Sequence, residues 1–205
     1  MTIDHVEVLV EEPSAGAALE LLLPKILGSM SFAVHQHQGK NDLLAKLPGR
    51  LRGYAAWVPA TCRILVIIDR DNEDCAKLKE RLNNMARSAQ LRPHSKVGAQ
   101  PWVVVNRIAI EELEAWYFGD WQAVRAAYPK AAASIPRDAK YRQPDAIAGG
   151  TWEAFERVMK KAGYFTGGLR KIEAARAIAE HMDPSRNTSP SFRALCDVLR
   201  EMTQG

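Results

Sequence analysis

The sequence predicts an α/β fold: a parallel sheet of about four strands, flanked by helices and followed by a C-terminal helical extension. Over the first 120 residues, short apolar runs alternate with segments of helical spacing, which is the pattern of a parallel sheet. The run 63–68 is continuously apolar after Arg63, as expected of a strand covered on both faces. No strand-like run follows Asp120, so we expect helices from there on.

Taken in chain order, the apolar runs predict strands at 6–10, 31–37, 63–68 and 102–106. Pro13 is suited to the first turn of a helix, where its missing N–H is not needed. Residues 129–150 are rich in proline and glycine and read as a connector. We therefore divide the chain into an α/β domain, residues 1–128, and a helical extension packed on it, residues 129–205. Helices are expected at 15–27, 40–51, from about 75 to 89, 111–118, 151–162, 169–182 and 191–202.

Composition is that of a globular protein, with 205 residues of which 47% are hydrophobic and 25% charged. No apolar run reaches the roughly 20 residues that span a bilayer, and acidic residues interrupt any signal-like pattern near the N-terminus. We expect a cytoplasmic protein with no membrane partner. Cys62, Cys75 and Cys196 lie far apart, which favours free thiols over a zinc site or a disulfide framework.

Charge is unevenly distributed along the chain, whose net charge is +4. Residues 1–129 hold 15 basic and 15 acidic side chains, whereas residues 130–205 hold 13 basic and 9 acidic. The second part therefore supplies the whole excess, which is compatible with a nucleic-acid surface without requiring one.

Acidic side chains follow three of the four predicted strands. Ligands of parallel α/β sheets bind outside the carboxyl ends of the strands, so we expect these carboxylates to converge. Like charges at close range repel unless a cation binds between them, and Mg²⁺ or Mn²⁺ accepts such oxygen ligands. The residues are Glu11, Glu12, Asp69, Asp71, Glu111, Glu112 and Glu114.

Each acid also has a structural interpretation. Asp69 or Asn72 could cap the helix that follows. Glu12 could simply favour the dipole of the helix that Pro13 opens. The glutamates at 111–114 could form a solvated first turn. Three acidic groups at three strand ends nevertheless favour a metal site.

Two motifs resemble a known family. The segment 9–15, LVEEPSA, resembles the Val-Glu-Ser-Pro-Ala-Lys segment of the topoisomerase–primase (Toprim) domain, and 68–71, IDRD, resembles its Asp-x-Asp motif. The resemblance implies a Toprim-like, Rossmann-like sheet over residues 6–120. It also implies that Glu11 is a general acid/base or metal neighbour, and that Asp69 and Asp71 bind Mg²⁺. Glu73 or Asp74 takes the place of a frequent third acid.

Two further segments, 38–44 (QGKNDLL) and 107–116 (RIAIEELEAW), resemble Toprim-like bacterial proteins of the family called domain of unknown function 4276. These are similar to the nuclease halves of overcoming-lysogenisation-defect proteins, which pair with ABC-type ATPases and often act in phage defence. The resemblance implies a metal-binding glutamate, Glu112 or Glu114, and a catalytic lysine, for which Lys171 is the candidate.

The sequence departs from these patterns at two positions. Ala15 stands where those nucleases have an acid, and Gly16 stands where topoisomerases have a lysine. Strand joining and priming are therefore poorly supported, whereas nucleic-acid cleavage or a degenerate site remains.

Three cations are candidates for binding the substrate. Lys40 opens a helix after Gly39, Arg70 lies inside the Asp-x-Asp motif, and Arg186 follows a predicted helix. A phosphate contact is one reading of each. A surface lysine at residue 40 and loop capping at residue 186 are the plainer readings. The basic residues of the C-terminal helices could guide a strand or form a solvated face; they are Lys160, Lys161, Arg170, Lys171 and Arg176.

Other patterns have competing interpretations. His35 and His37 would share a strand face, as a metal pair or, more commonly, as solvated polar residues. Aromatic residues 116–118 could stack on bases, although core packing is the commoner role. The Asp-x-Asp motif also resembles that of haloacid-dehalogenase phosphatases, but Glu73 replaces their threonine.

The function that these patterns favour is Mg²⁺- or Mn²⁺-dependent hydrolysis of phosphodiester bonds in DNA or RNA. A partner-gated, non-catalytic subunit of an ATPase complex is the alternative, and a small-molecule phosphatase comes third. Whether the chain acts as a monomer or as a homodimer is open.

Overall fold

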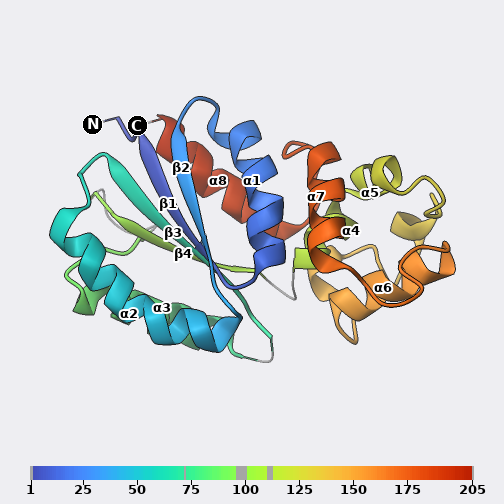
Figure 1. Ribbon diagram of the computed structural model, residues 1–205, viewed down its shortest axis with the longest axis horizontal. Helices are drawn as coiled ribbons and strands as arrows, with labels where there is room; N and C mark the ends of the chain where they lie inside the picture. Colours follow the sequence, from blue (N-terminus) through green and yellow to red (C-terminus); the bar gives the residue numbers. More distant parts are fainter. Residues whose placement is uncertain (1, 72, 96–100, 110–112, 205) are drawn as a thin grey trace.

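The computed structural model describes residues 2–71, 73–95, 101–109 and 113–204. Four parallel strands form one sheet in the order β2-β1-β3-β4 (Figure 1). The two most buried strands, β1 and β3, are therefore neighbours at its centre. The strands are β1 (His5–Val10), β2 (Ser31–Gln36), β3 (Cys62–Asp69) and β4 (Val104–Ala109).

Helices cover both faces of the sheet, as Figure 1 shows. On one face, α2 and α3 enclose a cluster of leucines and the side chains of β3 that point toward them. On the other face, α1 and the last helix, α8, cover a larger buried cluster. The helices concerned are α1 (Pro13–Leu27), α2 (Lys40–Trp57), α3 (Cys75–Ser88) and α8 (Pro190–Gln204).

The remaining helices form a lobe beside the carboxyl ends of the strands (Figure 1). Its helix α7 packs along α1, and the ammonium of Lys25 on α1 donates to the carbonyls that end α7, at Ala179, Glu180 and Met182. The larger buried cluster continues from the sheet into this lobe. The lobe contains α4 (Leu113–Gly119), α5 (Trp121–Ala127), α6 (Thr151–Lys161), α7 (Lys171–His181) and two 3₁₀ turns, Ile135–Arg137 and Pro144–Ala146.

The predicted fold class is confirmed, since the sheet is parallel, four-stranded and flanked by helices. Pro13 occupies the first turn of α1 as expected. The second helix runs on to Trp57 because Leu51 and Tyr54 continue its buried face past Pro48 and Gly49. The sequence did not predict α5, a short helix that Asp120 caps by accepting from the Ala123 N–H. The boundary at residue 128 stays a prediction.

Over the residues described, the structure has no helix with the length and apolar character to cross a bilayer.

Candidate active site at the carboxyl edge of the sheet

Glu11 and Asp69 meet where the two central strands end. Glu11 directly follows β1, and Asp69 is the last residue of β3. Because these strands are neighbours, the Glu11 carboxylate reaches across and its Oε2 accepts the backbone N–H of Asp69 at 3.0 Å. Glu11 is 8% exposed, so this carboxylate is buried at the sheet edge. The predicted convergence of these two acids is present in the fold.

A tight turn follows Asp69 and directs Asp71 toward Lys40. Asp71 has a backbone φ of +50°, a left-handed conformation that aspartate tolerates better than most residues. The Lys40 ammonium donates to the carbonyls of Asp69 and Arg70 at 2.8 and 3.1 Å. It also forms ion pairs with Asp71 at 3.0 Å and Glu73 at 2.8 Å. Burial lowers the pKa of Lys40, but the two carboxylates outweigh it and the net pKa is raised. Lys40 is thus a firmly charged cation among oxygens.

The helical lobe brings two further residues to the same edge. Glu114, in the first turn of α4, and Lys171, at the start of α7, line one small pocket with Glu11 and Asp69. Glu114 is only 3% exposed. The Lys171 ammonium lies 3.5 Å from Glu12, which also lines the pocket. Residues from four separate segments of the chain therefore converge on one place.

The pocket holds about 10 Å³, close to the space that a single water molecule or ion needs. The carboxylate oxygens that line it are the ligands that hard divalent cations prefer. Glu11, Asp69 and Glu114 could hold Mg²⁺ or Mn²⁺ there. Within the ranges described, however, no three carboxylate, histidine or cysteine side chains are already grouped as a metal site. Lys40 instead contacts Asp71 and Glu73, and Lys171 contacts Glu12. A bound cation would therefore require small movements of these side chains.

Burial raises the pKa of the Glu11 carboxyl above its ordinary value of 4.5, and nearby Asp71 adds to the rise. The hydrogen bond from the Asp69 N–H works in the opposite direction without cancelling it. A carboxyl whose pKa is shifted upward by its surroundings is a recurrent feature of catalytic bases.

This pKa shift predicts a pH-dependent stability. The folded state binds the Glu11 proton more tightly than the unfolded chain does, so its stabilising effect is complete below pH 4.5 and is lost as the pH rises through the raised value. Glu11→Gln should therefore raise the Tm relative to the wild type at pH 8, and change it little at pH 4. Scanning calorimetry in EDTA would measure both differences.

Glu20→Gln is the control for this measurement, because Glu20 lies exposed on α1. It should leave the Tm unchanged at either pH. An equal Tm difference between Glu11→Gln and the wild type at pH 4 and pH 8 would contradict the assignment.

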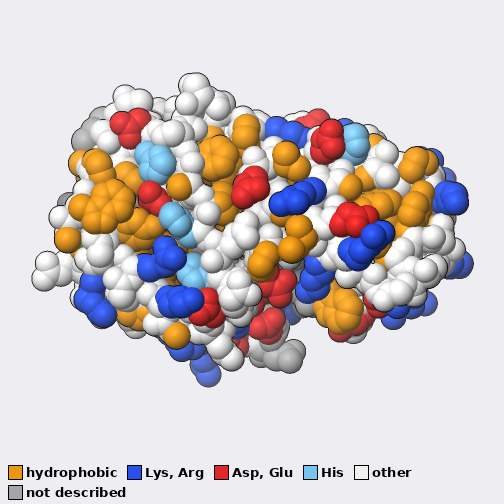
Figure 2. Space-filling model, viewed as in Figure 1, with side chains coloured by type: hydrophobic (Ala, Val, Ile, Leu, Met, Phe, Trp, Pro, Cys, Tyr) orange, Lys and Arg blue, Asp and Glu red, His pale blue; other side chains and the backbone are white. Residues whose placement is uncertain are grey.

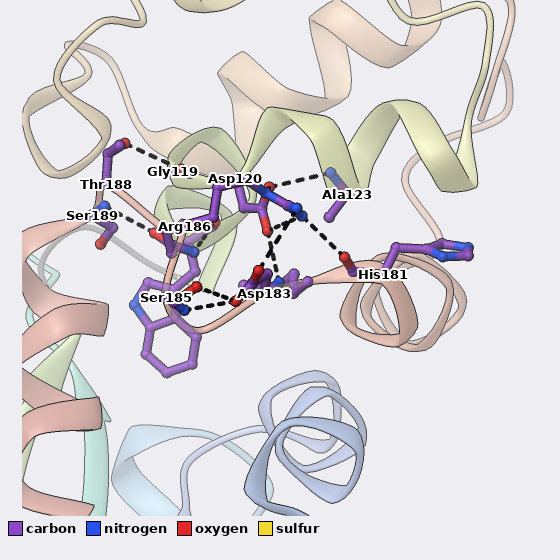
Figure 3. A network of polar contacts seen from close by, with 12 residues as sticks. Gly119, Asp120, Ala123, His181, Asp183, Ser185, Arg186, Thr188 and Ser189 are labelled. Carbon is purple, nitrogen blue, oxygen red and sulfur yellow. Dashed lines mark hydrogen bonds and ion pairs between the residues drawn. The ribbon is translucent and has the colours of Figure 1, made fainter. Parts of the chain in front are cut away.

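Arg186 has partners of its own outside the pocket. Its guanidinium forms two hydrogen bonds of 2.8 Å with the buried carboxylate of Asp120 (Figure 3). Asp120 also accepts from the N–H of Asp183, and Arg186 also donates to the His181 carbonyl. These contacts hold Arg186 within the structure of the lobe. The sequence had two readings of Arg186, phosphate binding and loop capping, and these contacts are of the second kind.

The other predicted site residues are only partly located. Glu112, like Glu111, lies outside the described residues, so Glu114 is the glutamate beyond β4 that the structure places in the pocket. Arg70 follows β3 directly and its N–H donates to the Ala109 carbonyl. Its role in substrate binding stays a prediction.

A family model describes nearly the whole chain. Residues 10–200 match the model named domain of unknown function (DUF4276). The chain belongs to this family. No curated protein matches this DUF4276 chain. Among solved structures it is similar to the C-terminal region of the OLD protein of Xanthomonas campestris pv. campestris, with 16% identity and a TM-score of 0.49. That similarity covers 98% of this DUF4276 chain and 94% of the other.

Several structural interpretations are settled by the fold of this DUF4276 chain. Asp74, not Asp69, caps α3 by accepting from the Lys77 N–H. Residues 116–118 are each less than 5% exposed, so they are core residues. His35 contacts Glu7, whereas His37 is buried and bonded to the Val10 carbonyl. The two histidines therefore form neither a shared metal pair nor a solvated face.

Sequence reasoning missed two side chains next to the pocket. The hydroxyl of Ser14 donates to Glu12 at 3.2 Å, and the Lys171 ammonium lies 5.5 Å from the centroid of the Trp152 ring. Ser14 lies inside the motif that resembles the Toprim segment, so it could have been noted. No signal in the sequence points to Trp152, which is brought to Lys171 only because the tertiary structure places the first turns of α6 and α7 near each other.

Proposed function

We propose that this DUF4276 protein is a metal-dependent nuclease that hydrolyses phosphodiester bonds in DNA or RNA, with a Toprim-like arrangement of its acids. The observation that supports the proposal most directly is the single pocket lined by Glu11, Asp69, Glu114 and Lys171. Carboxylates that converge at the carboxyl edge of a parallel sheet, next to a lysine, suit phosphoryl chemistry better than a structural role.

Each residue of the pocket has a chemical role in this proposal. Glu11, whose pKa is raised, accepts the proton of the attacking water. Lys171 stabilises the negative charge that develops on the phosphate. Asp69 and Glu114 would hold Mg²⁺ or Mn²⁺ together with Glu11, and Asp71, in the turn just outside the pocket, would join them once released from Lys40. The ion, when bound, supplies charge neutralisation at the phosphate oxygens.

The test is a cleavage assay with purified protein on plasmid, single-stranded DNA and RNA. We expect products with Mg²⁺ or Mn²⁺ and none in EDTA. Ca²⁺, which occupies similar oxygen sites with looser geometry, should support binding but little cleavage. Cleavage that persists in EDTA, or an Asp71→Ala variant that cuts as fast as the wild type, would refute the mechanism.

A second function, a partner-gated subunit, is favoured by one specific observation. Lys40 forms ion pairs with Asp71 and Glu73 and so neutralises two of the acids near the pocket. Such internal ion pairs are expected of a metal site that is kept inactive. In that case the isolated protein binds Mn²⁺ without cutting, and cleavage appears only when an ABC-type ATPase encoded beside it is added. Such a pair would suit a role in phage defence.

A further inference from the structure

The helical lobe contains a basic cleft on its surface, apart from the acidic pocket. This cleft has a volume of about 510 Å³, within the usual size of a ligand site. On the face shown in Figure 2, lysine and arginine side chains gather at the end of the molecule that this lobe forms. The charged side chains lining the cleft are Lys130, Lys140, Arg157, Lys161 and one acid, Asp138.

All four cations of the cleft are exposed. Within the described part of the chain, none of their side chains forms an ion pair or hydrogen bond. Two neighbouring basic residues behave differently: Lys160 on α6 pairs with Glu156, and Arg170, just before α7, pairs with Glu173. The cations of the cleft are therefore available to an external anion, and their number suits a chain of phosphates better than a single one.

An aromatic ring also lines the cleft. Tyr141 is half-buried and stacks on Phe118 with the ring planes 6° apart and the centroids 5.2 Å apart. Phe118 in turn stacks on Trp121 at 13° and 5.6 Å. Phe118 and Trp121 are buried, so they hold the Tyr141 ring rigidly at the cleft. A fixed aromatic ring beside several cations is the combination that binds unpaired bases and their phosphates.

Helix α6 connects this cleft to the candidate active site. Trp152, in its first turn, lies next to Lys171 of the acidic pocket, whereas Arg157 and Lys161 lie farther along the helix. At 1.5 Å per residue they are about 8 to 14 Å from Trp152 along the axis. The acidic pocket itself has room for little more than an ion, so the strand must be held by a neighbouring surface.

We propose that this cleft binds single-stranded nucleic acid, with a base against Tyr141 and phosphates on Lys130, Lys140, Arg157 and Lys161. This inference rests on the proposed nuclease function and identifies the form of its substrate. A duplex would keep its bases paired and away from Tyr141, so single strands should bind more tightly.

The test measures binding without cleavage, in EDTA at low salt, by fluorescence anisotropy with labelled single-stranded and duplex DNA and single-stranded RNA of about 20 residues. The double substitution Lys130→Glu/Lys161→Glu should weaken single-strand binding at least about tenfold and reduce its salt dependence. The control Lys46→Glu/Arg87→Glu, which reverses two exposed cations on α2 and α3, should change affinity less than about twofold.

Substitutions of Tyr141 distinguish the contribution of base stacking to binding from the contribution of charge. Tyr141→Leu should weaken single-strand binding by about 5- to 100-fold, and Tyr141→Phe should retain it. A thermal melt of each variant shows that the fold is kept. Equal binding by the reversal and control variants, undiminished binding by Tyr141→Leu, or tighter binding of duplex would each overturn the proposal. Because no cleavage is involved, an inactive enzyme that still binds would refute only the nuclease function.

Discussion

Replacing Glu11 by glutamine should reduce metal-dependent cleavage by about 100-fold or more while the protein stays folded. Glutamine has nearly the same shape, and its carbonyl can still accept the N–H of Asp69. What it loses is the negative charge at the proposed metal site and the ability to take a proton. Removing charge stabilisation worth several kcal/mol costs about a factor of ten in rate for each 1.4 kcal/mol. Single-turnover cleavage at saturating Mn²⁺ would measure the loss.

The control for this variant is Glu20→Gln, which removes a carboxylate exposed on α1. It should cleave at the wild-type rate, and both variants should melt cooperatively. A Glu11→Gln protein that is well folded and cuts within threefold of the wild type would exclude Glu11 from the reaction.

Removing the carboxylate of Asp120 should have the largest effect on stability. Its side chain is fully buried and serves three partners: the guanidinium of Arg186, the N–H of Asp183 and the N–H of Ala123 (Figure 3). The hydrogen bonds to Asp120 raise the pKa of Arg186, so its guanidinium stays charged beside this carboxylate. Losing one partner of such a pair, together with a helix cap, typically costs about 3 kcal/mol or more. In a chain of this size Asp120→Ala should lower the Tm by about 6 to 12 °C.

Two further variants test the role of the Asp120–Arg186 ion pair. Glu180→Ala removes an exposed carboxylate from α7 and should stay within about 0.5 kcal/mol of the wild type. Arg186→Ala should lower the Tm as well, with no loss of nucleic-acid affinity once the protein is folded. If Arg186→Ala instead weakened binding at an unchanged Tm, Arg186 would contact the substrate, as one reading of the sequence had it.

The sequence predicted the centre of the site, Glu11 and Asp69, because the position of these acids depends on short-range patterns. The alternation of strands and helices orients all strand ends to one edge, so acids that directly follow strands must gather there. Glu11 and Asp69 are in this class. Lys171 is different, since it lies about 100 residues beyond Asp69, and only the resemblance to nucleases pointed to it. No local pattern states which helix of the lobe will face the sheet.

Other contacts were beyond sequence reasoning because they depend on backbone detail. Lys40 meets Asp71 and Glu73 only because the turn after β3 takes a left-handed residue. Asp120 and Arg186 are 66 residues apart, and nothing near either one shows that the aspartate is buried. Gly119 is needed beside this pair, because a Cβ there would lie 2.8 Å from the backbone nitrogen of Ser189. Such close approaches follow from the packing of the whole lobe.

The position of α8 has a consequence for how the molecule is made. This helix is separated from β4 by the whole helical lobe, yet it packs on β4 and α1 and, together with α1, covers one face of the central sheet. During synthesis all four strands precede α8, so the part of that apolar face which α8 covers stays exposed until α8 has emerged, and the nascent sheet is open to association with other chains. We infer that the sheet and α8 reach their native state together, in one late and cooperative event. Fragments that end before α8 should be captured by chaperones.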